Sequence, residues 1–376
     1  MSVDRLITVA IYTYEKAQIV KSLLESEGIP VVIQNVNLIQ PVISSGVRVR
    51  IKETDLPHAL TILEAHNTLF DTPDSGKTKK GGDSRQHIVI PVDFSDYSYK
   101  ACSIGFDIAH KIDATVTVLH TYVIPYLPDA IPITDTFIGR EEMEEFKSIK
   151  ENAHKQMGEF FDKLKASIAA GELPDINFEC SVKEGVPEDE IRIMSRRVAP
   201  SLIVMGTRGK GRKDSELIGS VTAEVIDSAR VPVLAVPENT HVGRCSDLKR
   251  LAFVTSFDQR ELVAIDTFMR LFGEFDFDVV FVNFLPDKAD KINEIQMQYL
   301  EKYFVKHYPS KKCTCRFIAT KDILEGVNDF IKEENIDILS MTTRRRSIFA
   351  RLFNPSIAHR MIFHSDTPLL VIPAKK

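Results

Sequence analysis

One segment of the chain, GTRGKGRKDSELIGS at residues 206–220, combines glycines with the expected start of a helix. It follows the apolar run SLIVM, so it begins where a buried strand should end. Glycine lets backbone N–H groups approach a ligand closely. A helix N-terminus adds unpaired N–H groups and a partial positive charge, which suit an anion. These residue types in this order predict a cradle for phosphate groups.

The segment fits neither of two familiar phosphate-binding motifs. A Walker A motif that began at Gly206 would need lysine and then serine or threonine where the chain has Arg212 and Lys213. A dinucleotide fingerprint that began at Gly209 would need its third glycine at Asp214. It would also follow the first strand of its unit, whereas this segment follows the fourth. Both motifs are therefore excluded.

The segment has a different spacing: two glycines separated by two residues, then nine residues, then a glycine and a serine at the expected start of a helix. These residues are Gly206, Gly209, Gly219 and Ser220. The hydroxyl of Ser220, or that of Thr222 in the first turn, can cap the helix or donate to a phosphate oxygen. Loop glycines that only form turns are the alternative. Four elements at this spacing, at the carboxyl edge of a parallel sheet, favour a binding site.

The elements that position this segment belong to a chain of 376 residues, long enough for two or three domains. Residues 71–86 are rich in Gly, Lys, Ser and Asp, lack apolar periodicity and are expected to be a linker. Residues 1–70 show the pattern strand, helix, strand, strand, helix, which predicts a small α+β domain of ferredoxin-like shape. Strands alternate with helices in residues 87–238 and 248–376, which predicts two tandem α/β domains with doubly wound, Rossmann-like parallel sheets.

The two α/β segments are copies of one pattern. Residues 202–237 align without a gap on residues 338–373, at a constant offset of 136. The first strands of the copies are offset by 163, which leaves 27 more residues in the first copy, mostly within 124–146. An internal repeat of this length indicates two homologous domains.

The glycine spacing, with the runs VTAEVI and VPVLAVP that follow it, resembles the nucleotide-binding signature of the universal stress protein family. The run HIVIPVDFSDYSYKA, with Asp93 in a P-x-D-x-S setting, is similar to that family's first strand and turn. The resemblance covers residues 85–374 as two tandem domains. It implies the adenine nucleotide alpha hydrolase-like version of the doubly wound fold, with ATP or AMP as ligand, with or without Mg²⁺.

In ATP-binding members of that family, the acid after the first strand and a residue after the second strand hold the nucleoside. The glycine loop holds the ribose and the phosphates. The resemblance therefore implies a nucleoside end at Pro91, Val92 and Asp93, with a backbone contact from Thr121. It also implies a phosphate side lined by Met205, Gly206, Arg208, Gly209, Gly219, Ser220, Val221 and Thr222.

The second copy departs from this signature. Its differences are Thr342, Arg345 and Pro355 in place of the three glycines, and Ser256 in place of Asp93. Ser356 keeps the hydroxyl of the helix start. Side chains now fill the space that glycines leave open, so we expect no ATP site in this copy.

The N-terminal segment YTYEKAQIVKSLLESEGIPVVIQN resembles the prokaryotic signal transducing protein family. This resemblance implies a regulatory or partner-binding role, with a regulatory protein as the partner. It identifies no ligand for this domain.

Composition narrows the classes of partner. Charged residues of both signs make up 27% of the chain and the net charge is −5, so no binding surface for nucleic acid is expected. No apolar run reaches the roughly 18 residues that span a bilayer, and the start MSVDRLITVA lacks a signal-peptide core, so we expect no membrane partner and a cytoplasmic location. The five cysteines form no C-x-x-C pair and no Cys/His cluster, which predicts free thiols and no structural metal.

Three functions fit the sequence. The first, which we favour, is a nucleotide-dependent regulatory protein of the stress response. The second is a stress scaffold that binds no nucleotide and acts through protein or lipid-precursor contacts. The third is a slow ATPase or autokinase, although no spacing brings together the acids, clamp and base that phosphoryl transfer requires, so no catalytic residue is assigned.

The last strand of each copy, VPVLAVP and TPLLVIP, would leave an open sheet edge. In family dimers, these edge strands pair between subunits. We therefore expect the two copies to pair with each other as an intramolecular pseudo-dimer. A further homodimer stays compatible with the sequence.

Overall fold

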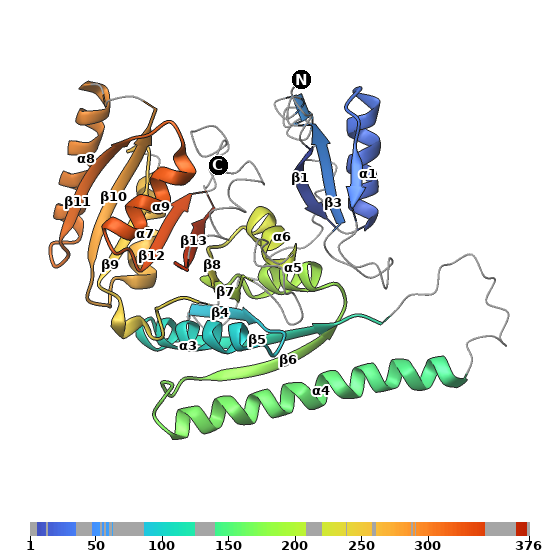
Figure 1. Cartoon of the computed structure of the whole chain (residues 1–376). Helices are drawn as coiled ribbons and strands as arrows, with labels where there is room; N and C mark the ends of the chain where they lie inside the picture. The colour runs from blue at the N-terminus through green and yellow to red at the C-terminus, as the bar shows by residue number, and fades with distance from the viewer. Residues whose placement is uncertain are drawn as a thin grey trace.

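The computed structural model describes most of the α/β region and part of the N-terminal region. The described residues are 6–12, 14–34, 47–52, 55, 58, 59, 62, 86–124, 140–207, 220–237, 239–257, 261–286, 289, 291–342 and 366–373. They form two sheets, one of three strands and one of ten strands (Figure 1).

The small N-terminal sheet has three antiparallel strands in the order β1-β3-β2. Its elements are β1 (Leu6–Tyr12), α1 (Tyr14–Ser26), β2 (Val32–Gln34) and β3 (Val47–Lys52). The apolar side of α1 packs on β3 in a separate core whose fully buried members include Ala17, Val20, Leu24, Val49 and Ile51. The second helix predicted for this domain falls mostly outside the described residues.

Each α/β segment contributes five parallel strands to the large sheet. In the first segment the elements are β4 (Gln86–Pro91), α3 (Asp96–Lys111), β5 (Ala114–Tyr122), α4 (Arg140–Ala169), β6 (Phe178–Glu184), α5 (Pro187–Val198), β7 (Leu202–Gly206), α6 (Ser220–Ser228) and β8 (Val233–Val236). In the second they are β9 (Arg250–Val254), α7 (Leu262–Phe272), β10 (Asp278–Leu285), α8 (Lys291–His307), β11 (Cys313–Ala319), α9 (Ile323–Glu333), β12 (Ile338–Thr342) and β13 (Leu369–Ile372).

The strand orders β6-β5-β4-β7-β8 and β11-β10-β9-β12-β13 are the same relative to the chain. Both follow the doubly wound topology, so the fold class predicted from the alternation of strands and helices is confirmed. The helix predicted between β12 and β13 lies outside the described residues.

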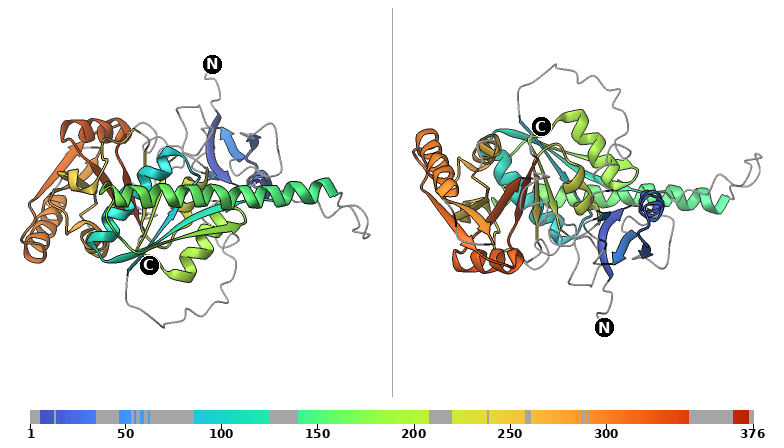
Figure 2. Two further views of the ribbon diagram at one scale, coloured as in Figure 1. Left: turned by 90° about the horizontal axis from the view of Figure 1, so that it is seen from below. Right: turned by 90° about the horizontal axis from the view of Figure 1, so that it is seen from above.

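Helices cover both faces of the ten-stranded sheet. One face packs against α3, α4, α7 and α8, and the other packs against α5, α6 and α9. Successive side chains of a strand point to opposite faces, so Ile88 and Ile90 join the first core and Val89 joins the second. Burial on both faces is why the central strands are continuous apolar runs in the sequence. The long helix α4 lies along one face, and its N-terminal part extends past the sheet (Figure 2).

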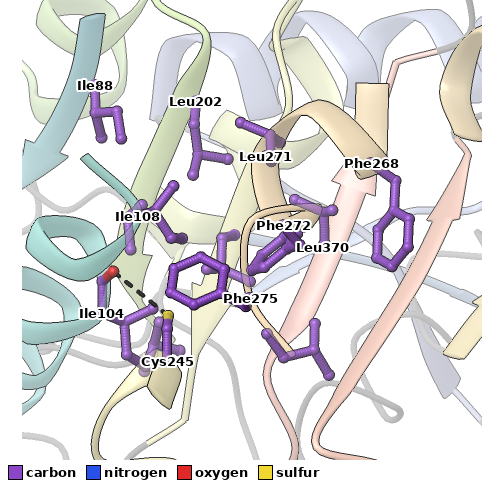
Figure 3. Close-up of a cluster of buried hydrophobic side chains, with 14 of the residues drawn as sticks. Ile88, Ile104, Ile108, Leu202, Cys245, Phe268, Leu271, Phe272, Phe275 and Leu370 are labelled. Carbon is purple, nitrogen blue, oxygen red and sulfur yellow. Dashed lines mark hydrogen bonds between the residues drawn. The ribbon is translucent and has the colours of Figure 1, made fainter. Parts of the chain in front are cut away.

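The two half-sheets are joined by antiparallel pairing of β8 with β13. The register places Leu234 opposite Leu370, and both side chains are fully buried. Figure 3 shows Leu370 in the core that also contains Phe272 and Phe275. The strands of the two halves run in opposite directions across this joint. The carboxyl ends of the strands in one half therefore point the opposite way from those in the other half.

The connector between the segments is folded against α3. Asp107, buried on α3, accepts hydrogen bonds from the guanidinium of Arg244 at 2.6 and 2.9 Å and from the N–H of Cys245 at 2.8 Å. The thiol of Cys245 lies 3.7 Å from the carbonyl oxygen of Ile104 (Figure 3). These contacts fix the start of the second segment against the first.

The same connector is also tied to the second segment. The buried carboxylate of Asp337 accepts from the N–H groups of Lys249 and Arg250 at 2.7 and 2.8 Å, and from the ring of His241 at 2.9 Å. The connector therefore holds both halves in register beside the β8–β13 joint. The domain boundaries expected from the sequence stay a prediction.

We expect Leu234→Ala and Leu370→Ala each to lower the free energy of unfolding by about 2–5 kcal/mol, as for other buried leucines. The double variant should lose less than the sum of the two, by at least about 0.5 kcal/mol, because the side chains are cross-strand neighbours. Urea unfolding of the four proteins measures this coupling. Leu234→Ala combined with Val327→Ala, in the core on the opposite face, is the control pair and should be additive. Additive effects at Leu234 and Leu370 would contradict the pairing.

Candidate functional site

The predicted site lies where three neighbouring strands, β7, β4 and β5, reach their carboxyl ends. Continued past the last pairs, the strand registers place Gly206 beside Val92 and Asp93 beside Thr121. Adjacent strands lie about 4.8 Å apart, so the three ends span about 10 Å. Six of the predicted residues come together here: Pro91, Val92, Asp93, Thr121, Met205 and Gly206.

Asp93 is held at the start of α3 by two serines. Its Oδ1 accepts from the hydroxyl of Ser95 at 2.5 Å and from that of Ser98 at 2.6 Å. The N–H of Asp93 donates to Ser98 Oγ at 2.9 Å, and Ser95 caps α3 by accepting from the Ser98 N–H. The P-x-D-x-S spacing thus builds a carboxylate that accepts hydroxyl groups, placed at the positive end of a helix.

Phe94, between Asp93 and the first serine, has left-handed backbone with φ of 63°. This conformation costs a residue with a side chain about 1–2 kcal/mol, so the surrounding structure must impose it. The ring of Phe94 lies 4.2 Å from that of His120 and 5.7 Å from that of Phe160, between ring centroids. The left-handed turn thus places an aromatic side chain under the strand ends.

His120 lies beside these residues but was not among the predicted site residues. Its Nδ1 lies 2.8 Å from the carbonyl oxygen of Val92. A carbonyl only accepts, so Nδ1 carries the proton and the neutral ring keeps Nε2 as an acceptor. Burial lowers the pKa of His120, against smaller raising effects of the Val92 carbonyl and of Asp93. The one signal in the sequence was its position, next to Thr121 at the end of a predicted strand.

On the phosphate side, α6 begins at Ser220. Thr222 in its first turn is buried, and its hydroxyl donates to the carbonyl of Gly206 at 2.8 Å. This hydroxyl ties α6 to the end of β7. The predicted part of Thr222 in nucleotide binding stays a prediction. The bond sets the N-terminus of α6 at the same sheet edge as Asp93.

Two further predicted site residues reach the edge through their backbone. The side chains of Val92 and Met205 are buried in the cores on opposite faces of the sheet, so only their backbone atoms face the edge. Val221 is half-buried in the first turn of α6. Arg208, Gly209 and Gly219 lie outside the described residues.

Comparisons with known proteins agree with this architecture. The sequence model described as "Universal stress protein family" matches residues 84–237 and 249–373, more than half of the chain. The chain belongs to the universal stress protein family. A second model, described as "Putative prokaryotic signal transducing protein", matches residues 15–67.

Individual known proteins are similar to this chain in sequence or in fold. A universal stress protein of Methanocaldococcus jannaschii is 34% identical over 158 residues, which cover 42% of this chain and 85% of that protein. A solved universal stress protein from Archaeoglobus fulgidus shares the fold, with a TM-score of 0.54, 18% identity and coverage of 77% of this chain and 97% of that one. Another, solved in complex with cAMP, is 24% identical and covers 41% of this chain and 98% of its own, with a TM-score of 0.30, and its ligand is a property of that protein.

The second universal stress domain keeps the backbone of the first strand end and changes its chemistry. Phe257 stands at the position of Phe94 and is also left-handed, with φ of 58°. The carboxylate now comes from Glu261 at the start of α7, whose Oε2 accepts from the Thr255 hydroxyl at 2.5 Å and the Ser256 N–H at 2.9 Å. The acid has moved from the strand end to the helix, where it is almost fully buried.

Thr342 ends β12 at the position where the first universal stress domain has Gly206. Its side chain is 1% exposed, and its hydroxyl has no hydrogen-bond partner within the part of the chain that the structure describes. The strand that ends in glycine in the first domain thus ends in a buried threonine side chain in the second. The expectation that the second domain has no ATP site stays a prediction.

Across the described ranges, no three His, Cys, Asp or Glu side chains group as metal ligands would. All five cysteines are free, and burial raises the pKa of Cys102 and Cys245, which keeps these thiols protonated at neutral pH. No helix among the described residues has both the length and the apolarity to cross a bilayer. The cytoplasmic location stays a prediction.

We expect acidification to destabilise the protein through His120. Its pKa is lower in the folded chain than in the unfolded chain, so the unfolded chain takes up the proton more readily. The stabilisation is complete above the unfolded value of about 6.5 and is lost as the pH falls below it. His87, whose pKa burial also lowers, acts in the same direction.

Urea unfolding at pH 7.5 and pH 5 measures this effect. His120→Asn keeps a donor for the Val92 carbonyl and removes the titration, so its loss of stability on acidification should be smaller than that of wild type. His110→Asn, at an exposed position on α3, is the control and should behave like wild type. An equal loss in His120→Asn and wild type would contradict the assignment.

Proposed function

We propose that the first universal stress domain binds one adenine nucleotide, ATP or AMP, across the carboxyl ends of β7, β4 and β5. The observation that carries this proposal is the hydrogen bond from Thr222 to Gly206. Because of it, the N-terminus of α6 and the hydroxyl-accepting carboxylate of Asp93 lie at one edge, at the ends of the adjacent strands β7 and β4. A nucleotide needs both features, one for its phosphates and one for its ribose.

The nucleoside end fits a sugar through its donor and acceptor types. Asp93 already accepts from two hydroxyl groups, and the ribose of a nucleotide offers the same kind of donor. The backbone of Thr121, level with Asp93, would contact the adenine ring. Pro91 and Val92 would shape the floor of this end, since the side chain of Val92 is already part of the core.

The phosphate end would be built from backbone groups and a helix start. Gly206, Gly209 and Gly219 would let backbone N–H groups reach the phosphates, and the Ser220 hydroxyl would donate to a phosphate oxygen. Arg208 would add a positive charge. Met205 and Val221 would contribute through their backbone. This arrangement holds phosphates and supplies no lysine clamp, so it suits binding and release better than phosphoryl transfer.

We propose that binding and release of the nucleotide make the protein a regulatory module of the stress response. Phosphates bound at the N-terminus of α6 would change the surface that this end of the helix offers to a regulatory protein partner. The membership of the chain in the universal stress protein family supports the stress-response part of this role.

Calorimetric titration of ATP and AMP into the full chain, with and without Mg²⁺, tests the proposal. We expect saturable binding of one nucleotide per chain. Gly209→Val should lower the affinity at least about tenfold, because a branched side chain blocks the approach of the backbone to the phosphates. If neither ATP nor AMP binds to the wild-type chain, the proposal is wrong.

The repeat supplies a matched control. Ser220 and Ser356 stand at the same position of the two copies, 136 residues apart. Ser220→Ala should weaken nucleotide binding about five- to tenfold, the loss of one hydrogen bond to a charged group, while Ser356→Ala should leave it unchanged. Equal effects of the two substitutions would place the nucleotide elsewhere.

We also propose that the two universal stress domains form an intramolecular pseudo-dimer, in which the β8–β13 pairing takes the place of an edge contact between subunits. The buried pair Leu234 and Leu370 at the joint supports this view. Sedimentation should give a monomer, and its solution scattering should fit a single compact α/β body. Scattering that shows two separated domains would rule the pseudo-dimer out, and a dimer of whole chains would show that a further edge is used.

A further inference from the structure

The small N-terminal domain touches the large sheet through one of its strands. Strand β1 lies against α6 of the first universal stress domain (Figure 1). Among the described strands of its own sheet, β1 lies at the edge and pairs with β3. An open strand edge is a liability that proteins often cover with a helix or loop. The position of α6 beside β1 meets that need.

The N-terminal domain does not depend on this contact for its own core. Ala17, Val20 and Leu24 of α1 pack on Val49 and Ile51 of β3, and this cluster is separate from the two cores of the large sheet. The domain therefore has the construction of a distinct body that docks, and docking can change without loss of its fold.

α6 is covered on several sides. It contacts α5 and β8 as well as β1, and Thr222, Ala223, Val225 and Ile226 are all at least 95% buried. Asp227 is the exposed residue among the side chains described for this helix. A short helix held between three neighbours transmits a shift on one side to the others.

The start of the same helix is the phosphate end of the proposed nucleotide site. The Thr222 hydroxyl fixes the first turn of α6 to Gly206, at the end of β7. Phosphates bound at the N-terminus of α6 therefore act on the helix that β1 contacts.

We propose that the N-terminal domain senses the nucleotide state of the first universal stress domain through α6. This inference rests on the proposed nucleotide binding. Bound phosphates fix the N-terminus of α6, and a more ordered α6 holds β1 more tightly. By linkage, docking of β1 raises the affinity for the nucleotide by the same factor. The N-terminal domain is thus the first receiver of the signal, within the same chain.

Hydrogen exchange of the full chain, without nucleotide and with saturating ATP or AMP, tests the coupling. We expect the amides of β1 to exchange at least about fivefold more slowly when the nucleotide is bound, the low end of allosteric coupling. The amides of β2, on the other edge of the same sheet, should change less. Gly209→Val, at the same nucleotide concentration, should show no slowing in β1.

The reciprocal arm uses two exposed apolar residues of the small sheet. Leu6 on β1 is 37% exposed and Val32 on β2 is 47% exposed. Leu6→Glu should weaken nucleotide binding at least about fivefold, and Val32→Glu should change it less than twofold. Hydrogen exchange of the α1 amides should be unchanged in both variants, which would show that the domain stays folded. Nucleotide binding with unchanged or faster exchange in β1 overturns this inference alone. Absence of any nucleotide binding overturns it together with the proposed function.

Discussion

The antiparallel pairing of β8 with β13 is the contact on which the rest of the structure depends. It converts two five-stranded sheets, each with an open edge, into one sheet of ten strands. The connector reinforces it, because Asp107 in the first half and Asp337 in the second each hold part of the same short segment. Because this pairing is antiparallel, the carboxyl ends of the strands in the two halves point in opposite directions. The residues at the carboxyl ends of one half can therefore change without affecting those of the other half.

The turns after β4 and β9 share a backbone conformation and differ in their chemistry. Phe94 and Phe257 are both left-handed, a conformation that a side chain adopts only when its surroundings require it. Around that common turn, the first domain places Asp93 at the strand end, and the second places Glu261 on the helix. One arrangement presents a carboxylate at the edge beside a bare Gly206. The other buries its carboxylate and fills the equivalent strand end with Thr342.

α6 connects the chemistry of the first edge with the rest of the molecule. Its first turn is bonded to the end of β7, its apolar residues belong to one of the two cores, and β1 of the N-terminal domain lies on it. Because α6 is short, buried and shared by three neighbours, a shift of its first turn has a consequence for each of them.

The sequence by itself determined the repeat, the doubly wound topology and the identity of the strand ends, because all of these follow from the local order of apolar runs, glycines and helix caps. It also placed Asp93 at the carboxyl edge through the P-x-D-x-S spacing. Only the tertiary structure decided what the side chains do there. Thr222 bonds to Gly206 and His120 to the Val92 carbonyl, since these partners lie 16 and 28 residues away and no local pattern specifies them. The contact of β1 with α6 is of the same kind, because it depends on how two separately folded cores meet.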